Sequence, residues 1–322
     1  MKAVGLISGG LDSALAVKVI GLQGIEVIGL AFESPFMHPR IKELAQNLGI
    51  QISVFDVSEE HLGLIRNPSF GFGRNMNPCI DCHIFMLKKA KAFMLKQGAD
   101  FIIAGDVLGQ RPMSQNKAAL KKIEEESGLE GLLLRPLSAR LLPISIPEQK
   151  GWVKREGLFD FSGRSRKPQL DLAERLGLAG FTQPAGGCLL TDPAFSKRLS
   201  DLVAHQQEFD LDDIGLLKLG RQFRISSQAK LVLGRNQKEN QGLTGYLRKG
   251  DFLLEPIATP GPTGLLRAKV ASQDLLELSA EILAYYCDEN GLRFDISIKN
   301  GESSQVVRCP ALEKEKIERL RL

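Results

Sequence analysis

The first 200 residues alternate between short apolar runs and longer segments with helical spacing. Near-continuous apolar runs of four to eight residues are typical of strands covered on both faces. They predict strands at 4–7, 25–32, 50–57, 101–104 and 132–137. Helical patterns lie at 14–22, 39–48, 78–97, 146–156 and 168–176. This alternation predicts an α/β fold with a doubly wound parallel sheet, in which ligands bind beyond the carboxyl ends of the strands.

The hydrophobic pattern changes after a polar stretch near 195–209. Strand-like runs punctuated by glycine follow at 230–233, 251–256 and 293–299, the last of them alternating and leading into a Lys299-Asn300-Gly301 turn. Helical spacing returns at 272–286 and 313–320. We therefore expect two domains, 1–200 and 201–322, the second a smaller α+β domain.

The composition is that of a globular protein in a reducing compartment. Of the 322 residues, 43% are hydrophobic and 25% charged, and no apolar run approaches the ~20 residues of a membrane span. The first residues lead straight into a strand and not into a signal peptide, so we expect a cytoplasmic protein without a membrane partner. Five cysteines, an odd number, favour free thiols with chemical or metal roles over a disulfide framework.

The formal net charge of +4 permits an RNA partner without requiring one. From position 201 onward there are 17 Lys and Arg against 18 Asp and Glu, which leaves 25 against 20 before it. The excess positive charge therefore lies in the N-terminal part.

The string Ser8-Gly9-Gly10-Leu11-Asp12-Ser13 stands between the first predicted strand and helix. Its glycines allow consecutive N–H groups to turn inward, and the helix start adds unpaired donors, so the string predicts a phosphate cradle. No lysine follows as in the Walker A pattern. Asp12 could instead hold a metal carried by the nucleotide. An ordinary strand-to-helix turn is the alternative.

This six-residue string resembles the PP-loop of the ATP pyrophosphatases, which include tRNA thiolases and GMP synthetase. The resemblance implies bound ATP and Mg²⁺, adenylation of a substrate and release of pyrophosphate. It further implies that Ser8 to Ser13 bind the phosphates and that Phe32 and Gly105 flank the adenosine. Sheet packing for Phe32 and a plain turn for Gly105 are the alternatives.

Two cysteines, Cys79 and Cys82, fall in the first turn of the predicted long helix, with Asn77 as expected N-cap and Pro78 at the first helical position. The helix N-terminus favours the thiolate, which attacks electrophiles or binds metal. A Cys-x-x-Cys pair can be a redox dithiol, half of a metal site or two packed side chains.

A single pair cannot close a four-coordinate metal site, so a further ligand is needed. The best candidate is Cys188, because the Gly186-Gly187 pair before it can present a thiol from a loop. Cys287 and Cys309 stand in apolar or featureless contexts, and we interpret them as structural.

Cys82 and Cys188 resemble the paired cysteines of bacterial tRNA 2-thiouridylases. Cys79 departs from that pattern, because it stands where those enzymes usually carry an acid. Three cysteines, Cys79, Cys82 and Cys188, are instead similar to the site of the iron–sulfur-dependent tRNA thiolases, which implies a 4Fe-4S cluster with one open iron. The sulfur is carried either by such a cluster or by a cysteine persulfide. The resemblance also gives catalytic roles to Asp12, Cys82 and Cys188.

Two further loops carry polar groups. The basic loop 163–169, with Arg164, Arg166 and Lys167, is either a solvated turn or a phosphate contact. The loop that begins at Gly105 and Asp106 is expected at the active site.

The C-terminal part contains the strings Gly220-Arg221-Gln222-Phe223-Arg224 and Gly234-Arg235-Asn236. They resemble signatures of the NFACT-R domain, over about 210–263, which implies a link to RNA. Arg221, Arg224 and Arg235 could contact phosphates or form a solvated face.

Together these patterns predict an ATP-dependent tRNA sulfurtransferase that adenylates a nucleobase carbonyl and replaces its oxygen with sulfur. The expected partners are tRNA and an external sulfur donor, which is a cysteine desulfurase, a carrier or sulfide. One alternative is a PP-loop enzyme that activates a carboxylate or small metabolite and binds zinc through its cysteines. Another is a non-catalytic RNA-binding or ribosome-binding adaptor.

Overall fold

The structure is a computed structural model that describes residues 1–37, 41–181, 188–288 and 293–322. The chain divides into two compact units, Met1–Asp192 and Pro193–Leu322. Within the described ranges, no helix combines the length and the apolar character that crossing a membrane would demand.

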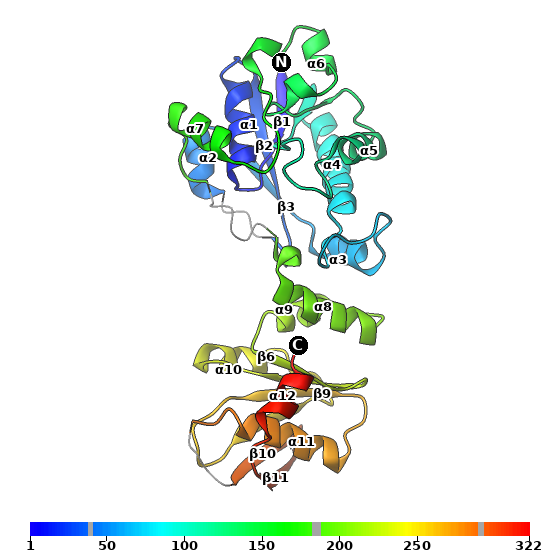
Figure 1. The fold of residues 1–322 in the computed structure, drawn as a ribbon, viewed down its shortest axis with the longest axis vertical. Helices are drawn as coiled ribbons and strands as arrows, with labels where there is room; N and C mark the ends of the chain where they lie inside the picture. Colours follow the sequence, from blue (N-terminus) through cyan, green and yellow to red (C-terminus); the bar gives the residue numbers. More distant parts are fainter. Residues whose placement is uncertain (38–40, 182–187, 289–292) are drawn as a thin grey trace. The chain divides into compact units, whose positions relative to one another are not determined.

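The N-terminal unit is built on a five-stranded parallel sheet with the strand order β3-β2-β1-β4-β5 (Figure 1). This confirms the predicted doubly wound α/β fold. The strands are β1 (Lys2–Leu6), β2 (Glu26–Glu33), β3 (Ile52–Asp56), β4 (Phe101–Ile103) and β5 (Leu133–Leu134). The helices of the unit are α1 (Leu11–Gly21), α2 (Lys42–Leu48), α3 (Ser58–Arg66), α4 (Cys79–Lys96), α5 (Lys117–Ser127), α6 (Ile146–Gln149) and α7 (Lys167–Arg175).

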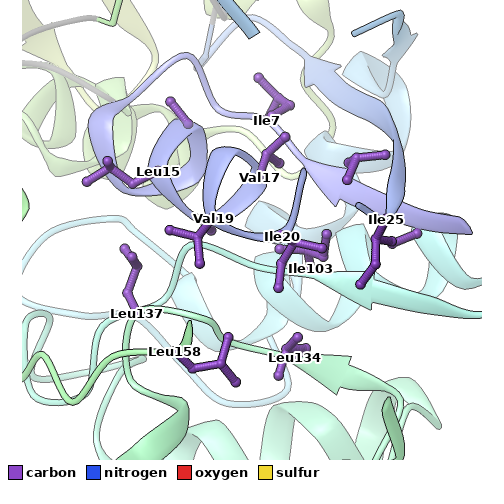
Figure 2. Close-up of a cluster of buried hydrophobic side chains, with 14 of the residues drawn as sticks. Ile7, Leu15, Val17, Val19, Ile20, Ile25, Ile103, Leu134, Leu137 and Leu158 are labelled. Atoms are coloured by element: carbon purple, nitrogen blue, oxygen red, sulfur yellow. The ribbon is translucent and has the colours of Figure 1, made fainter. Parts of the chain in front are cut away.

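Neighbouring residues of each central strand enter different hydrophobic clusters, because successive side chains of a strand point to opposite faces. Ala3 and Ile103 pack with α1, α2 and α7, whereas Val4 and Ile102 pack with α4 and α5. Figure 2 shows the first cluster, in which side chains of α1 face Leu134 and neighbouring residues. Helices thus cover both faces, which explains why the strands read as continuous apolar runs.

Three helical segments differ from the prediction. The pattern at 146–156 predicts one helix, but the structure has the four-residue α6 and then a 3-10 turn at Arg155–Gly157. Glycine at 151 with φ 67° separates them, a conformation that interrupts a helix. The sequence analysis missed α3 and α5 altogether.

The C-terminal unit folds around a six-stranded sheet with the order β11-β10-β8-β9-β7-β6, and its strand pairs are antiparallel. The strands are β6 (Arg221–Ser226), β7 (Ala229–Leu233), β8 (Phe252–Pro256), β9 (Gly264–Ala268), β10 (Phe294–Asn300) and β11 (Ser303–Cys309). The helices are α8 (Pro193–His205), α9 (Leu211–Leu217), α10 (Gln237–Thr244), α11 (Gln273–Ala284) and α12 (Lys314–Leu320). Phe223, Leu231 and Ile282 are fully buried in its core, so this unit is α+β as predicted.

Candidate functional site

The candidate site lies at the carboxyl edge of the parallel sheet, where several strand ends meet. β1 leads into the PP-loop at Ser8, β2 into Ser34, β3 into α3 and β4 into Gly105. The first turn of α4 belongs to the same edge, because the helix runs back from it toward the start of β4. The PP-loop residues, Gly105, Cys79 and Cys82 therefore come from elements that end or begin here.

The PP-loop is held by the hydroxyls of its first and last residues. Gly9 has φ 79°, a conformation that favours glycine, and Gly10 caps α1. Ser13 Oγ donates to the Gly10 carbonyl at 2.9 Å and lies 3.1 Å from Ser8 Oγ. These contacts turn the loop back onto the start of α1, whose unpaired N–H groups make an anion site.

Asp12 has two distinct carboxylate oxygens. Its Oδ2 accepts from Gln110 Nε2 at 2.8 Å and lies 3.8 Å from the Arg166 guanidinium. Its Oδ1 is buried without a hydrogen-bond partner among the described residues. A buried carboxylate oxygen without a donor suits a bound cation, which is the role that the sequence predicts.

The basic loop 163–169 reaches this carboxylate from α7. Arg166 lies beside Asp12, and Gln169 Nε2 donates to Gln110 Oε1 at 3.0 Å. Gln169 is fully buried, and its own Oε1 has no partner among the described residues. Gln110 is therefore held between Asp12 and Gln169, a pair of contacts that the sequence analysis missed because glutamine carries no motif signal.

Gly105 lies directly against the PP-loop. A Cβ at this position would stand 2.5 Å from Ser13 N and 2.6 Å from Asp12 C. No side chain fits there, so this glycine permits close approach of β4 to the phosphate loop. Phe32 is only 6% exposed and packs edge-on against Phe55, with ring centroids 6.4 Å apart. Contacts of Phe32 and Gly105 with adenosine stay predictions.

The first turn of α4 presents Cys79 and Cys82, as predicted, but its cap differs. Pro78 is the capping residue and makes no side-chain bond, so the prediction of Asn77 as N-cap is wrong. The Asn77 side chain instead donates from Nδ2 to Cys79 Sγ at 3.1 Å. It thereby fixes the position of one thiol.

Cys188 lies on the same side as the α4 thiols, although 106 positions separate it from Cys82. The residue after it, Leu189, donates its N–H to the Phe36 carbonyl at 2.9 Å. Thr191 accepts from Asn75 Nδ2 through its carbonyl at 2.7 Å. The Gly186-Gly187 pair lies outside the described residues. These bonds bring the third thiol to the loop that precedes α4.

The thiols of Cys79, Cys82 and Cys188 interact electrostatically. Burial raises the pKa of Cys82 well above its usual range, and the neighbouring Cys188 and Cys79 thiols raise it further. Burial likewise raises the pKa of Cys188 to about 11. The expectation that the helix N-terminus favours the thiolate is therefore wrong for Cys82, because desolvation of a charged sulfur outweighs the helix dipole.

His61, which the sequence analysis missed, connects Cys82 to β2. It is fully buried, with Nδ1 3.0 Å from Ser34 Oγ and Nε2 3.5 Å from Cys82 Sγ. Burial lowers the pKa of His61 to about 4, so the ring is neutral. A neutral imidazole has one donor and one acceptor nitrogen and can serve both neighbours.

A second buried network lies behind Cys82. His83 Nδ1 is 3.8 Å from Asp106 Oδ1, to which Gln115 Nε2 donates at 3.0 Å. Burial alone would raise the pKa of Asp106, but His83 and Arg135 hold it below its usual range. Asp106 therefore anchors the loop that begins at Gly105.

The same loop joins the two halves of the site. Gln110 contacts Asp12 of the PP-loop, and the adjacent Arg111 lowers the pKa of Cys188 against the effect of burial. One short segment thus contacts the phosphate cradle and interacts electrostatically with a thiol. This is the relationship that a reaction between a nucleotide-activated group and a sulfur atom needs.

The three thiols do not form a ready metal site. Among the described residues, no group of three His, Cys, Asp or Glu side chains is arranged as metal ligands. Cys309 and Cys287 belong to the hydrophobic core of the C-terminal unit, which agrees with a structural role. The observed arrangement brings thiols together without the geometry of a closed cluster site.

Comparison with known proteins finds a family that is similar to part of each unit. Residues 1–141 match the family described as thiamine biosynthesis protein (ThiI), and residues 220–321 match the NFACT protein RNA binding domain.

Two curated relatives are tRNA-specific 2-thiouridylases MnmA. The protein from Helicobacter hepaticus is 29% identical over 143 residues, which are 39% of each chain. The protein from Thiobacillus denitrificans is 26% identical over 220 residues, 61% of this chain and 56% of that one. The chain thus matches about two fifths of the length of the first relative and just over half of the length of the second.

Two solved structures are also similar to the chain. A 4-thiouridine synthetase in complex with RNA and bound ATP is 19% identical, with a TM-score of 0.40 over 67% of this chain and 52% of that one. The C-terminal part of the fibronectin/fibrinogen-binding protein from Streptococcus suis is 13% identical, with a TM-score of 0.30 over 76% of this chain and 96% of that one. The family matches confirm the PP-loop and NFACT-R resemblances predicted from the sequence.

Proposed function

We propose that this chain, whose N-terminal unit is a PP-loop domain of the tRNA thiolase type and whose C-terminal unit is NFACT-R-like, is an ATP-dependent tRNA sulfurtransferase. The observation that carries the proposal is the loop after β4. Its Gln110 donates to Asp12 of the phosphate cradle at 2.8 Å, and its Arg111 lowers the pKa of the Cys188 thiol, so one segment interacts with both halves of the site.

ATP binds with its phosphates at the PP-loop in this proposal. The N–H groups at the start of α1 and the loop glycines receive the phosphates. Asp12 Oδ1, a buried oxygen that has no donor among the described residues, would hold Mg²⁺. Magnesium, when bound, neutralises phosphate charge. Gln110 and Arg166 hold the other oxygen of Asp12, so that the carboxylate keeps one orientation.

Adenylation activates the nucleobase. The carbonyl oxygen of a uridine or cytidine attacks the α-phosphorus, an O–P bond forms, and the bond to pyrophosphate breaks. The base carbon then carries AMP, a good leaving group, in place of an oxygen that leaves poorly. The PP-loop contributes by binding pyrophosphate charge, which stabilises the departing group.

Sulfur transfer uses the thiols beside the loop. Sulfur carried on Cys188 attacks the activated carbon, a C–S bond replaces the C–O bond, and AMP leaves with the oxygen. If the sulfur is a persulfide, Cys82 releases it by forming a disulfide with Cys188, which an external reductant must reverse. His61, 3.5 Å from Cys82 Sγ, is placed to exchange a proton with that thiol.

The iron–sulfur cluster stays a prediction from the resemblance. Cys79, Cys82 and Cys188 would be its ligands. The described residues include no group of three side chains arranged as metal ligands. The proposed sulfur transfer therefore uses the thiols alone. The sulfur donor is proposed to be an external desulfurase, carrier or sulfide.

Pyrophosphate release separates this proposal from its rivals. Purified protein with ATP, Mg²⁺ and bulk tRNA is expected to release pyrophosphate, and tRNA digested beforehand with ribonuclease should support none. A PP-loop enzyme that activates a carboxylate or small metabolite would show no dependence on tRNA. An adaptor with a degenerate pocket would release no pyrophosphate, and either outcome would contradict the proposal.

A further inference from the structure

The C-terminal unit contains a cavity of about 950 Å³. The residues that line it come from the end of α8 and the segment after it, from α9, from β6, β7 and β9 with their adjoining turns, and from the segment 248–251 before β8. They all belong to the one compact unit Pro193–Leu322. The volume lies at the upper end of the range of small-molecule sites, so the cavity can hold more than one small ion.

Positive charge is concentrated on this cavity. Its lining includes six Lys and Arg residues, namely Arg224, Lys230, Arg248, Lys249, Arg267 and Lys269, against three Asp and Glu residues, namely Glu208, Asp213 and Asp251. Residues 201–322 as a whole carry 17 basic against 18 acidic side chains. Asp201 and Asp210, beside the lining, also pair with its Arg224 and Arg248, so the local positive excess is small and rests on side chains without such a partner.

The arginines of the lining are already used by the fold. Arg224 donates to both carboxylate oxygens of Asp201, at 2.9 and 2.6 Å. Arg267 donates to Asp213 at 2.9 Å and to Asp251 at 2.8 Å. These paired, partly buried side chains form the wall of the cavity.

Two arginines of the sequence motifs, Arg221 and Arg235, also contact other side chains of the domain. Arg221 stacks on Tyr286, with 4.6 Å from the guanidinium carbon to the ring centroid, and Arg235 forms an ion pair with Glu239. Their contacts with other parts of the domain stabilise the fold. Both arginines thus already have a partner within the domain, and the Arg235 side chain is 48% exposed.

The lysines are the cations that remain. Lys230 is 12% exposed, and its nearest carboxylate oxygen, Asp201 Oδ2, is 3.8 Å away and already bound by Arg224. Burial lowers the pKa of Lys230 to about 8, so most of it is charged at neutral pH. Lys249 and Lys269 are exposed and form no ion pair within the described part of the chain.

Apolar side chains complete the cavity. Leu202, Leu216, Val232 and Leu265 contribute to the lining beside the lysines. Each of these side chains is at most 6% exposed, so they form the closed floor of the cavity, and a nucleic acid would contact the cavity through its phosphates.

We propose that this cavity binds a phosphate-bearing stretch of RNA, with Lys230 at its base and Lys249 and Lys269 at its rim. The inference rests on the proposed function only in taking tRNA as the RNA. It assigns the contact to three lysines and not to the arginines of the sequence motifs.

The test measures binding of fluorescently labelled bulk tRNA to the full chain over a series of KCl concentrations. Lys249→Glu/Lys269→Glu is expected to raise Kd at least tenfold at about 100 mM salt and to lower the slope of log Kd against log salt by about two. Lys314→Glu/Lys316→Glu, an equal charge change on exposed lysines of α12, is the matched control and should leave Kd within about twofold. Equal Kd values for the two variants would overturn the inference.

Lys230→Met tests the base of the cavity, because methionine keeps an unbranched chain and removes the charge. A roughly tenfold rise in Kd is expected, with an unchanged thermal melt as the check on folding. Unaltered Kd in a folded Lys230→Met protein would remove this lysine from the site.

If tRNA binds through the rim lysines but no pyrophosphate is released, the proposed function fails and the cavity assignment stands. If pyrophosphate release depends on tRNA but the rim variant binds normally, the cavity assignment fails alone.

Discussion

The Nε2 atom of His61 lies 3.5 Å from Cys82 Sγ, inside the protein and at the end of a hydrogen-bonded path that begins at Ser34. The two residues come from different elements, α3 and α4, and no sequence motif links them. This contact supplies the thiol with a neutral imidazole as its proton partner.

The buried imidazole makes stability depend on pH. His61 has a pKa of about 4 in the fold against its ordinary 6.5, so the unfolded chain binds more protons between these values. The stabilisation is complete above pH ~6.5 and is lost as pH falls toward 4, by up to ~3 kcal/mol. Urea unfolding at pH 7 and pH 4.5 should show that the free energy of unfolding falls more in the wild type than in the His61→Asn variant. Parallel pH dependence in the two proteins would contradict a neutral, buried His61.

Gly105 is predicted to tolerate no side chain. In Gly105→Ala the new methyl group would meet the backbone of Asp12 and Ser13, at 2.6 and 2.5 Å, and push the phosphate loop away. We expect ATP affinity to fall at least tenfold, measured by calorimetry. Gly21→Ala, at the end of α1, has nothing within 4 Å of the added atom and is the control. Equal ATP affinity in the two variants would show that the loop and β4 need not approach so closely.

Gln110 is predicted to hold Asp12 through a neutral amide. Gln110→Glu would place a second carboxylate where the amide now donates at 2.8 Å, and the like charges would repel. A loss of about tenfold or more in tRNA-dependent pyrophosphate release is expected. Gln46→Glu makes the same change on the exposed face of α2 and should retain full activity. A fully active Gln110→Glu protein would remove the orienting role of this contact.

The thiol of Cys188 is predicted to be protonated near neutral pH. Its pKa of about 11 means that the thiolate fraction keeps rising through pH 10. In metal-free protein, the rate of iodoacetamide alkylation at this position, mapped by mass spectrometry, should rise about tenfold per pH unit from 7 to 10. A plateau near pH 8.5 would indicate an ordinary exposed thiol.

Much of the N-terminal fold could be predicted from sequence because its strands are covered on both faces. Residues 3–6 of β1 and 27–32 of β2 include no polar side chain, and the PP-loop string fixes where the first strand ends. The helices α3 and α5 were missed. Each carries several charged side chains and shows its apolar face through only two or three buried apolar residues, so its helical spacing is harder to see.

The site was predicted only where a motif names a residue. Asp12, Cys79, Cys82 and Cys188 belong to strings with recognisable glycine or cysteine spacing. His61, Gln110 and Gln169 act through contacts made by folding, across 21 to 98 positions of sequence. The protonation state of the thiols also could not be read from position on a helix, because burial opposes the helix dipole.

Nucleoside mass spectrometry of bulk tRNA tests the central claim most directly. Comparison of a deletion strain with strains that express the wild type, Cys82→Ser or Cys188→Ser should show one thionucleoside lost on deletion. The wild type should restore it, and neither cysteine variant should do so, whereas Cys287→Ser, a change in the core of the C-terminal unit, should behave as the wild type. An unchanged set of thionucleosides in the deletion strain, or full thiolation by Cys82→Ser, would contradict the account.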